Sequence, residues 1–224
     1  MPWCGQSLDE RRGIVYVATK TAEPDFYGGK RHGMNLFANS VLALNAATGK
    51  RIWQFQVVHH DLLDKDLPCP PVLLTVNHGG RQIDAVAQGS KHGLLFVFDR
   101  VTGEPIWPIE ERPVPQSSLQ GESSSPTQPF PTWPLPYERQ GLTNDDLIDF
   151  TPELRQQAVE LIKTYHYGPM YTPVAHQPTI FLPGWFGGTN WEETAFDPES
   201  KIWYVPSITS RSPESWTITS NFTF

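Results

Sequence analysis

Cysteine, charge and long hydrophobic runs are all scarce in this chain of 224 residues. Two cysteines, Cys4 and Cys69, are too few for a disulfide scaffold. The apolar runs span only a few residues, far below the roughly 20 that a transmembrane helix needs. The first residues lack both a basic and an apolar stretch, so we expect no signal peptide or anchor in this chain. A net charge of −7 argues against a nucleic-acid partner.

Turn-forming and aromatic residues are abundant instead. The chain holds 22 prolines and 17 glycines, which favours turns and loops. Intrinsic disorder would explain such a bias, but disordered chains are poor in aromatic residues. Here Trp, Phe and Tyr number 8, 12 and 7. The composition therefore predicts an ordered, turn-dense and mainly β protein.

A repeated hairpin indicates the architecture. Residues 41–53 align with residues 95–107, and both end in Asx-x-x-Thr-Gly-x-x-Ile-Trp, with Trp53 and Trp107 at the same offset. Further β-type runs lie at 13–17, 83–88, 193–196 and 202–205. Self-similarity at a period of about 50 residues is typical of four-stranded propeller blades. Two chance hairpins of similar turn chemistry are the alternative.

A segment at about 108–170 differs from the rest. Its first part is rich in proline and serine, which predicts an extended excursion. Thr151 followed by Pro152 then places a hydroxyl cap before a proline at the first helical position. We therefore expect one helical and proline-rich insertion in a β chain.

Two polar clusters could carry chemistry. Residues 59–66 contain two histidines and three aspartates, including Asp64, which could bind a metal or supply a general base. The alternatives are a solvated loop, or a metal-binding hydrolase built on His59, His60 and Asp64. Adjacent histidines in a strand would point to opposite faces, which disfavours joint ligation. Lys91 lies between glycines at a strand junction, where a plain surface charge is the alternative.

These segments together resemble the quinoprotein dehydrogenases that use pyrroloquinoline quinone (PQQ), in particular the glucose/quinate branch. Residues 43–53 resemble the family's tryptophan-docking turn, and residues 59–64 resemble its His-His-Asp-Leu-Trp-Asp signature. Lys91 follows Asp64 by 27 residues, the offset that the family uses. Residues 98–100, 113–115 and 126–130 resemble further family segments.

The resemblance implies a fold, a cofactor and a reaction. It implies an eight-bladed β-propeller with PQQ and Ca²⁺ or Mg²⁺ near its axis, oxidising the CH–OH group of an alcohol, sugar or cyclic polyol. Electrons would pass to a quinone or a cytochrome, in the periplasm or on a membrane facing it. Asp64 would be the catalytic base and Lys91 the cation at the quinone oxygens. Asn190 and Trp191 would approach the cofactor. Thr21, Glu23 and Asp64 would supply metal oxygens.

The length predicts only part of such a ring. At about 54 residues per blade, and after subtracting the insertion, the chain supplies about three blades of eight. Leu63 stands where the family signature has Trp. A truncated, non-catalytic propeller fragment that acts at most as a binding remnant is therefore the alternative function.

Overall fold

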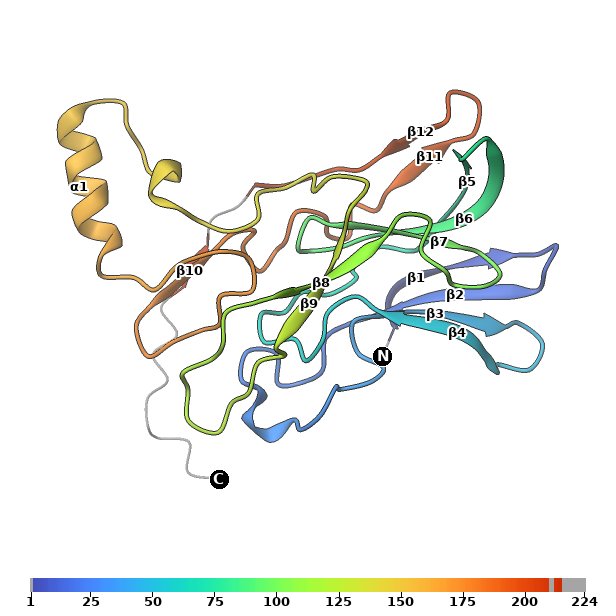
Figure 1. Cartoon of the computed structure of the whole chain (residues 1–224), viewed down its shortest axis with the longest axis horizontal. Coiled ribbons are helices and arrows are strands. Elements are labelled where there is room, and N and C mark those ends of the chain that lie inside the picture. The colour runs from blue at the N-terminus through green and yellow to red at the C-terminus, as the bar shows by residue number, and fades with distance from the viewer. Residues whose placement is uncertain (1, 210–211, 215–224) are drawn as a thin grey trace.

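The computed structural model describes residues 2–209 and 212–214, and antiparallel strands dominate it (Figure 1). The first sheet is a four-stranded meander in chain order. Its strands are β1 (Pro2–Asp9), β2 (Ile14–Thr19), β3 (Ser40–Asn45) and β4 (Arg51–Gln56). This is the strand arrangement of one propeller blade.

A second sheet repeats most of this pattern. It contains β5 (Val72–His78), β6 (Arg81–Gly89) and β7 (Leu95–Asp99), again in chain order. The chain then returns along β7, because Phe98 bridges Pro105 and the Ile106 amide donates to the Val97 carbonyl at 2.9 Å. The two aligned hairpins of the sequence therefore occupy matching places in successive sheets.

Trp53 packs the first sheet against the second. Its ring lies 5.8 Å from that of Phe98 and 6.0 Å from that of Tyr16, in the cluster of buried residues that joins the two sheets. The indole Nε1 donates to the Arg100 carbonyl at 3.2 Å. The predicted docking of this tryptophan on a neighbouring blade is confirmed.

The remaining strands form two-stranded antiparallel sheets. β8 (Ile109–Pro113) pairs with β9 (Thr127–Pro131), β10 (Thr179–Phe181) with β13 (Ser212–Glu214), and β11 (Ala195–Asp197) with β12 (Ile202–Tyr204). The β11–β12 hairpin packs Phe196 and Trp203 beside the second sheet. The described sheets do not close into a ring, as the expected partial propeller requires.

The helical arm stands apart from the sheets (Figure 1). It carries the 3₁₀ turn η2 (Asn144–Asp146) and helix α1 (Pro152–Ile162), and a second 3₁₀ turn, η1 (Gly28–Lys30), lies in the β2–β3 connection. The Thr151 hydroxyl accepts from the Leu154 amide at 3.2 Å, so the predicted helix start is confirmed. The insertion also contains the paired strands β8 and β9. Each is an edge of a two-stranded sheet, a position at which proline is tolerated.

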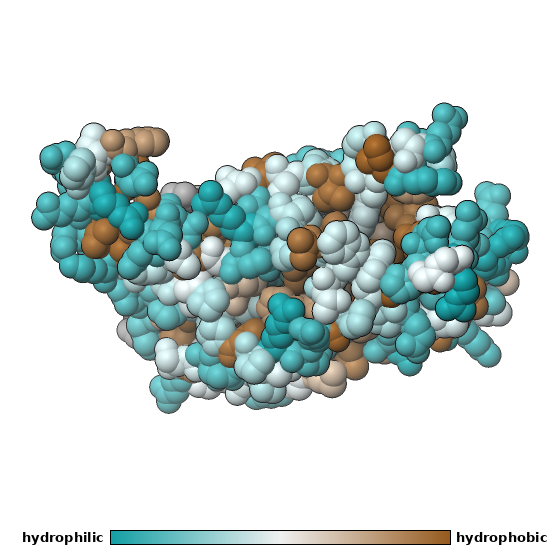
Figure 2. Space-filling model, turned by 45° about the horizontal axis from the view of Figure 1, so that its top comes forward, coloured by the Kyte–Doolittle hydropathy of each residue, from teal (hydrophilic) through white to brown (hydrophobic). Residues whose placement is uncertain are grey.

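Figure 2 shows a largely hydrophilic surface on which hydrophobic residues appear in separate patches. In the part of the chain that the structure describes, no helix has the length and apolarity needed to cross a membrane.

The connections sort to two ends of the sheets. The tight β1–β2, β3–β4 and β5–β6 turns lie together on the right of Figure 1, and we call this the turn end. Consecutive connections of a meander alternate between ends. The longer β2–β3, β4–β5 and β6–β7 connections therefore meet at the opposite end, the loop end. The turn at 99–103, which follows β7, belongs to the turn end. Asp64 and Lys91 both belong to it.

Candidate active site

A buried lysine between two aspartates forms the centre of the loop end. The Lys91 ammonium lies 2.9 Å from Asp64 Oδ2 and 2.6 Å from Asp66 Oδ2. Lys91 and Asp66 are almost fully buried, whereas 16% of the Asp64 side chain remains exposed. Hydrogen bonds between charged groups are roughly twice as strong as neutral ones, so this triad joins the β4–β5 and β6–β7 connections firmly.

A second aspartate shapes the loop that presents Asp64. The buried Asp61 carboxylate accepts from the backbone amides of Leu63 at 2.9 Å and Lys65 at 2.6 Å, and from Asn39 Nδ2 at 3.0 Å. These bonds wrap the chain around Asp61. Asp64 sits inside the wrapped turn with φ 53°, a conformation that Asp tolerates better than most residues.

The charges of the triad are unequal. The pKa of Asp64 is raised to about 7: burial is the main cause, the positive charge of Lys91 opposes the rise, and the neighbouring Asp66 adds to it. Burial would lower the pKa of Lys91, but the two carboxylates outweigh it and the net shift is upward. Lys91 therefore stays charged, and Asp64 is the group that can exchange a proton near neutral pH.

Aromatic rings and glycines surround the lysine. The Lys91 ammonium lies 4.8 Å from the centre of the Trp3 ring, and the Trp3 and Trp191 rings meet edge to face at 5.3 Å. A Cβ on Gly187 would lie 2.5 Å from Lys91 Cα and Cβ, so only glycine allows this approach. The Gly188 amide donates to the Lys91 carbonyl at 2.8 Å.

Of the other predicted site residues, some lie near the triad and others do not. Trp191 reaches Lys91 through Trp3, whereas the Asn190 amide group donates to the Phe186 carbonyl within its own segment. The Thr21 backbone amide donates to Asp66 Oδ1 at 2.7 Å, which brings the β2–β3 connection to the triad. Glu23 is exposed and pairs with Lys20 instead.

Among the described residues, two buried oxygen atoms near the triad have no hydrogen-bond partner: Thr21 Oγ1 and Asp25 Oδ1. Burial, and then the charge of Asp66, raise the pKa of Asp25. Unsatisfied buried oxygens beside carboxylates are suited to a hard divalent cation, which takes oxygen ligands. In the described ranges, no three His, Cys, Asp or Glu side chains converge as a metal site. Any cation here would need ligands from elsewhere as well.

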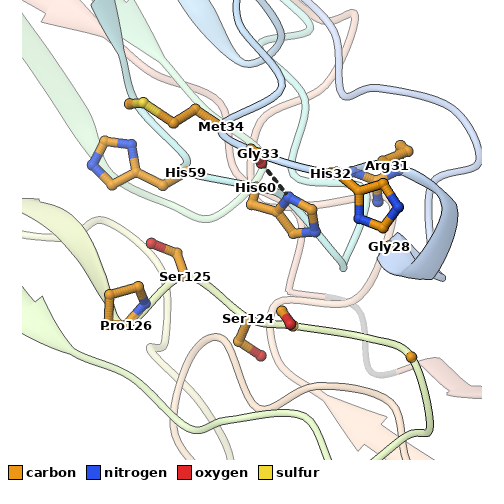
Figure 3. Close-up of a pocket in the computed structure, with 12 residues that line it drawn as sticks. Gly28, Arg31, His32, Gly33, Met34, His59, His60, Ser124, Ser125 and Pro126 are labelled. Carbon is orange, nitrogen blue, oxygen red and sulfur yellow. Dashed lines mark hydrogen bonds between the residues drawn. The ribbon is translucent and has the colours of Figure 1, made fainter.

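The two adjacent histidines face other partners. His59 Nδ1 and Nε2 bond Gln56 at 3.1 Å and Glu111 at 2.9 Å, and His60 Nδ1 bonds the Gly33 carbonyl at 2.7 Å. Figure 3 shows their rings directed to different parts of a separate cavity of about 400 Å³. This arrangement gives no support to a hydrolase metal site built on both histidines and Asp64.

Sequence reasoning missed Trp3 and Asp66. Asp66 was visible as a third aspartate in the loop, but nothing local distinguishes it from a solvated acid. Trp3 belongs to β1, whose burial alternates weakly. Both become site residues only because they contact Lys91, which lies 25 positions after Asp66 and 88 positions after Trp3.

The fold and this site define a class: part of a β-propeller whose loop end holds a paired acid and amine. A protein-family model described as "PQQ: Glucose/ethanol/alcohol dehydrogenase, beta-propeller domain" matches residues 2–220. The chain belongs to this family.

Curated relatives agree with the family match. Quinoprotein glucose dehydrogenase A of Acinetobacter calcoaceticus is 36% identical over 208 residues, covering 89% of this chain and 26% of the relative. Quinate/shikimate dehydrogenase (quinone) of Acinetobacter baylyi is 34% identical over 205 residues, covering 91% and 25%. The chain thus spans about a quarter of the length of these relatives.

Solved structures show the same fold. The quinohemoprotein alcohol dehydrogenase from Comamonas testosteroni superposes with a TM-score of 0.59 at 21% identity, covering 92% of this chain and 25% of that one. A europium-containing methanol dehydrogenase gives a TM-score of 0.56 at 18% identity, covering 92% and 29%.

Proposed function

We propose that this chain supplies the proton acceptor and the quinone-facing cation of a PQQ-dependent dehydrogenase that oxidises the CH–OH group of a sugar, alcohol or cyclic polyol. The observation that carries the proposal is the Asp64–Lys91–Asp66 triad, with one partly exposed carboxylate and one buried cation. When bound, PQQ supplies the acceptor for the hydride that leaves the carbinol carbon.

Asp64 is suited to accept the alcohol proton. A general base works best when its pKa lies near the operating pH, and burial holds the pKa of Asp64 near 7. Its partial exposure leaves an approach for substrate. Asp66 keeps its own bond to Lys91, so the lysine stays paired when the Asp64 carboxylate turns to substrate.

Lys91 is suited to stabilise negative charge on a bound quinone. Its ammonium is buried, and a fixed charge acts more strongly where water is excluded. The indole of Trp3 presents a flat surface beside that ammonium, and Gly187 lets the backbone approach it closely. These features fit a planar, anionic cofactor.

We also propose that a divalent cation, Ca²⁺ or Mg²⁺, binds near Thr21 and the aspartates. The unpartnered Thr21 Oγ1 and Asp25 Oδ1 support this proposal and favour Asp25 over Glu23 as a donor. Such a cation would act as a Lewis acid toward the cofactor carbonyl.

The proposals for substrate, electron acceptor and location draw on the names of the relatives and on the family resemblance. Relatives are named for glucose, quinate or shikimate, and glycerol, which supports a polyol-like substrate. One relative is named for a quinone and another for cytochrome c, so both acceptor classes are proposed here. A periplasmic location is proposed on the family resemblance.

The test is a titration of the chain with PQQ in the presence of Ca²⁺ or Mg²⁺, followed by quenching of tryptophan fluorescence. We expect saturable binding with a Kd of about 10 μM or tighter, weakened at least about tenfold in Lys91→Met and in Trp3→Leu. Lys163→Met, on the exposed end of the helical arm, is the matched control.

Two outcomes count against the proposal: no saturable quenching, or equal affinity in the wild type and both site variants. Binding that depends on Lys91, without turnover of any sugar or polyol with an artificial electron acceptor, would instead support the binding-remnant function for this chain.

A further inference from the structure

Lys65 is a second buried lysine beside the triad, and the proposed chemistry does not use it. Its side chain is fully buried, and in residues 2–209 and 212–214 its ammonium forms no ion pair with a carboxylate. It donates instead to two backbone carbonyls, those of Pro183 at 2.9 Å and Gly184 at 3.0 Å. The ring centre of Phe181 lies 5.1 Å from the same nitrogen.

Such a placement needs an explanation, because burying an ammonium is costly. Burial lowers the pKa of Lys65 to about 8, although the charge of Asp61 opposes the shift. The two carbonyls and the aromatic face satisfy the three ammonium donors. The lysine is therefore held by a site made of backbone oxygens and a ring, all from residues 181–184.

The carbonyls that Lys65 binds begin the segment that touches Lys91. Three residues after Gly184, Gly187 packs against the Lys91 side chain, and the Gly188 amide bonds the Lys91 carbonyl. The segment then continues to Trp191, which meets Trp3. Residues 183–191 are thus bound at their start by Lys65 and at their middle by Lys91.

Lys65 also follows Asp64 directly in the chain. Its backbone amide donates to Asp61 Oδ2, so its backbone belongs to the wrapped turn that presents Asp64. Its side chain bonds residues 118 and 119 positions away. One residue therefore connects the turn that presents the proposed base with the segment that walls the site.

We propose that Lys65 is a positioning residue that fixes segment 183–191 against the Asp64 turn and thereby sets the wall of the cofactor site. The statement that this segment faces a cofactor rests on the proposed function. The link between turn and segment stands on contacts within the chain.

The experiment compares Lys65→Met with wild type by amide hydrogen exchange and by PQQ titration. Met keeps a long unbranched side chain but has no donor for the two carbonyls. We expect amides of residues 184–191 to exchange at least about tenfold faster, while β2 and β3 keep their protection. We expect PQQ affinity to fall about 10- to 100-fold, as is typical when a residue that orients ligand-contacting groups is replaced.

Lys50→Met is the matched control, since Lys50 is exposed in the β3–β4 turn. Lys65→Gln restores a donor for a carbonyl and should recover part of the exchange protection. If Lys65→Met does not fold, the comparison of Lys65→Gln with wild type decides by the same readouts.

Unchanged exchange at 184–191, or faster exchange spread equally over β2 and β3, would overturn the proposal. The exchange measurement needs no cofactor. If the wild-type chain does not bind PQQ, the proposed function is wrong. The exchange measurement would still decide whether Lys65 links the Asp64 turn to segment 183–191.

Discussion

The two ends of the sheets are built in different ways. At the turn end, Asn45 and Asp99 make the same local bonds: Asn45 Oδ1 accepts from the amides two and three residues on at 3.1 and 2.9 Å, and Asp99 Oδ1 does so at 2.8 and 2.9 Å. At the loop end, the bonds that matter join residues far apart in sequence, such as Thr21 with Asp66 and Lys65 with Pro183.

This difference places residues that stabilise the fold at the turn end and residues that could carry chemistry at the loop end. A turn that satisfies its own backbone can be repeated from blade to blade, because it needs no partner elsewhere. The loop end collects buried charges, whose cost is met only when several connections are in place. We therefore expect substitutions at the turn end to change stability, and substitutions at the loop end to change activity and its pH dependence.

The largest expected effect comes from the same change made at each end. In a PQQ-loaded dehydrogenase containing this chain, Asp64→Asn should lower kcat/KM by about 10²- to 10⁴-fold, because the base is lost while the side-chain shape remains. Asp99→Asn keeps the oxygen that its turn needs, so we expect a change below about twofold. Steady-state kinetics with an artificial acceptor measures both. Equal losses at the two ends would contradict the division.

The sequence predicted the turn end far better than the loop end. The repeated Asx-x-x-Thr-Gly pattern and its tryptophan are local, and the structure confirms the hairpins and the docking of Trp53. The capped start of α1 at Thr151 is local as well. Strand β5 was missed because Val72–His78 follows two prolines, and β8 because Ile109–Pro113 looks like an exposed polar loop.

The sequence alone marked Asp64 and Lys91 as separate candidates, and only the resemblance predicted that they act at one site. The structure brings Asp64 and Lys91 together, but their separation of 27 residues carries no physical signal by itself. Asp66, Trp3 and Lys65 act through contacts that depend on how the loops meet. Their side chains look like ordinary surface or core residues in the sequence. Burial of charge is decided by tertiary structure, so local patterns do not reveal it.

The second expected effect is a pH-dependent stability that only the loop end shows. Asp64 has a pKa near 7 when folded and about 4 when unfolded. Between these values the native state holds more protons, so this group stabilises the fold below about pH 4 and loses that contribution as the pH rises through 7. Asp64→Asn should therefore be more stable than wild type above pH 7, by up to about 4 kcal/mol, and equal to it near pH 4.

Urea unfolding between pH 4 and pH 8 measures this difference, with Asp99→Asn as the turn-end control. The control should run parallel to wild type across the range. A stability difference for Asp64→Asn that does not vary with pH would show that the carboxyl is not held near a pKa of 7.

The smallest expected effect tests the turn end against itself. Gly49 and Gly103 occupy equivalent turn positions with φ 67° and 76°, so alanine is strained at both. They differ in their surroundings: a Cβ on Gly49 would meet no described residue within 4 Å, whereas one on Gly103 would lie 2.6 Å from the Trp53 ring. Gly49→Ala should cost about 1 kcal/mol, the conformational strain alone. Gly103→Ala should cost about 1–3 kcal/mol more, because the docked indole has to move.

Thermal or urea unfolding of the two variants measures the difference between their losses of stability. Equal losses would mean that Trp53 does not rest on the second blade's turn, and that the two hairpins share only their local chemistry.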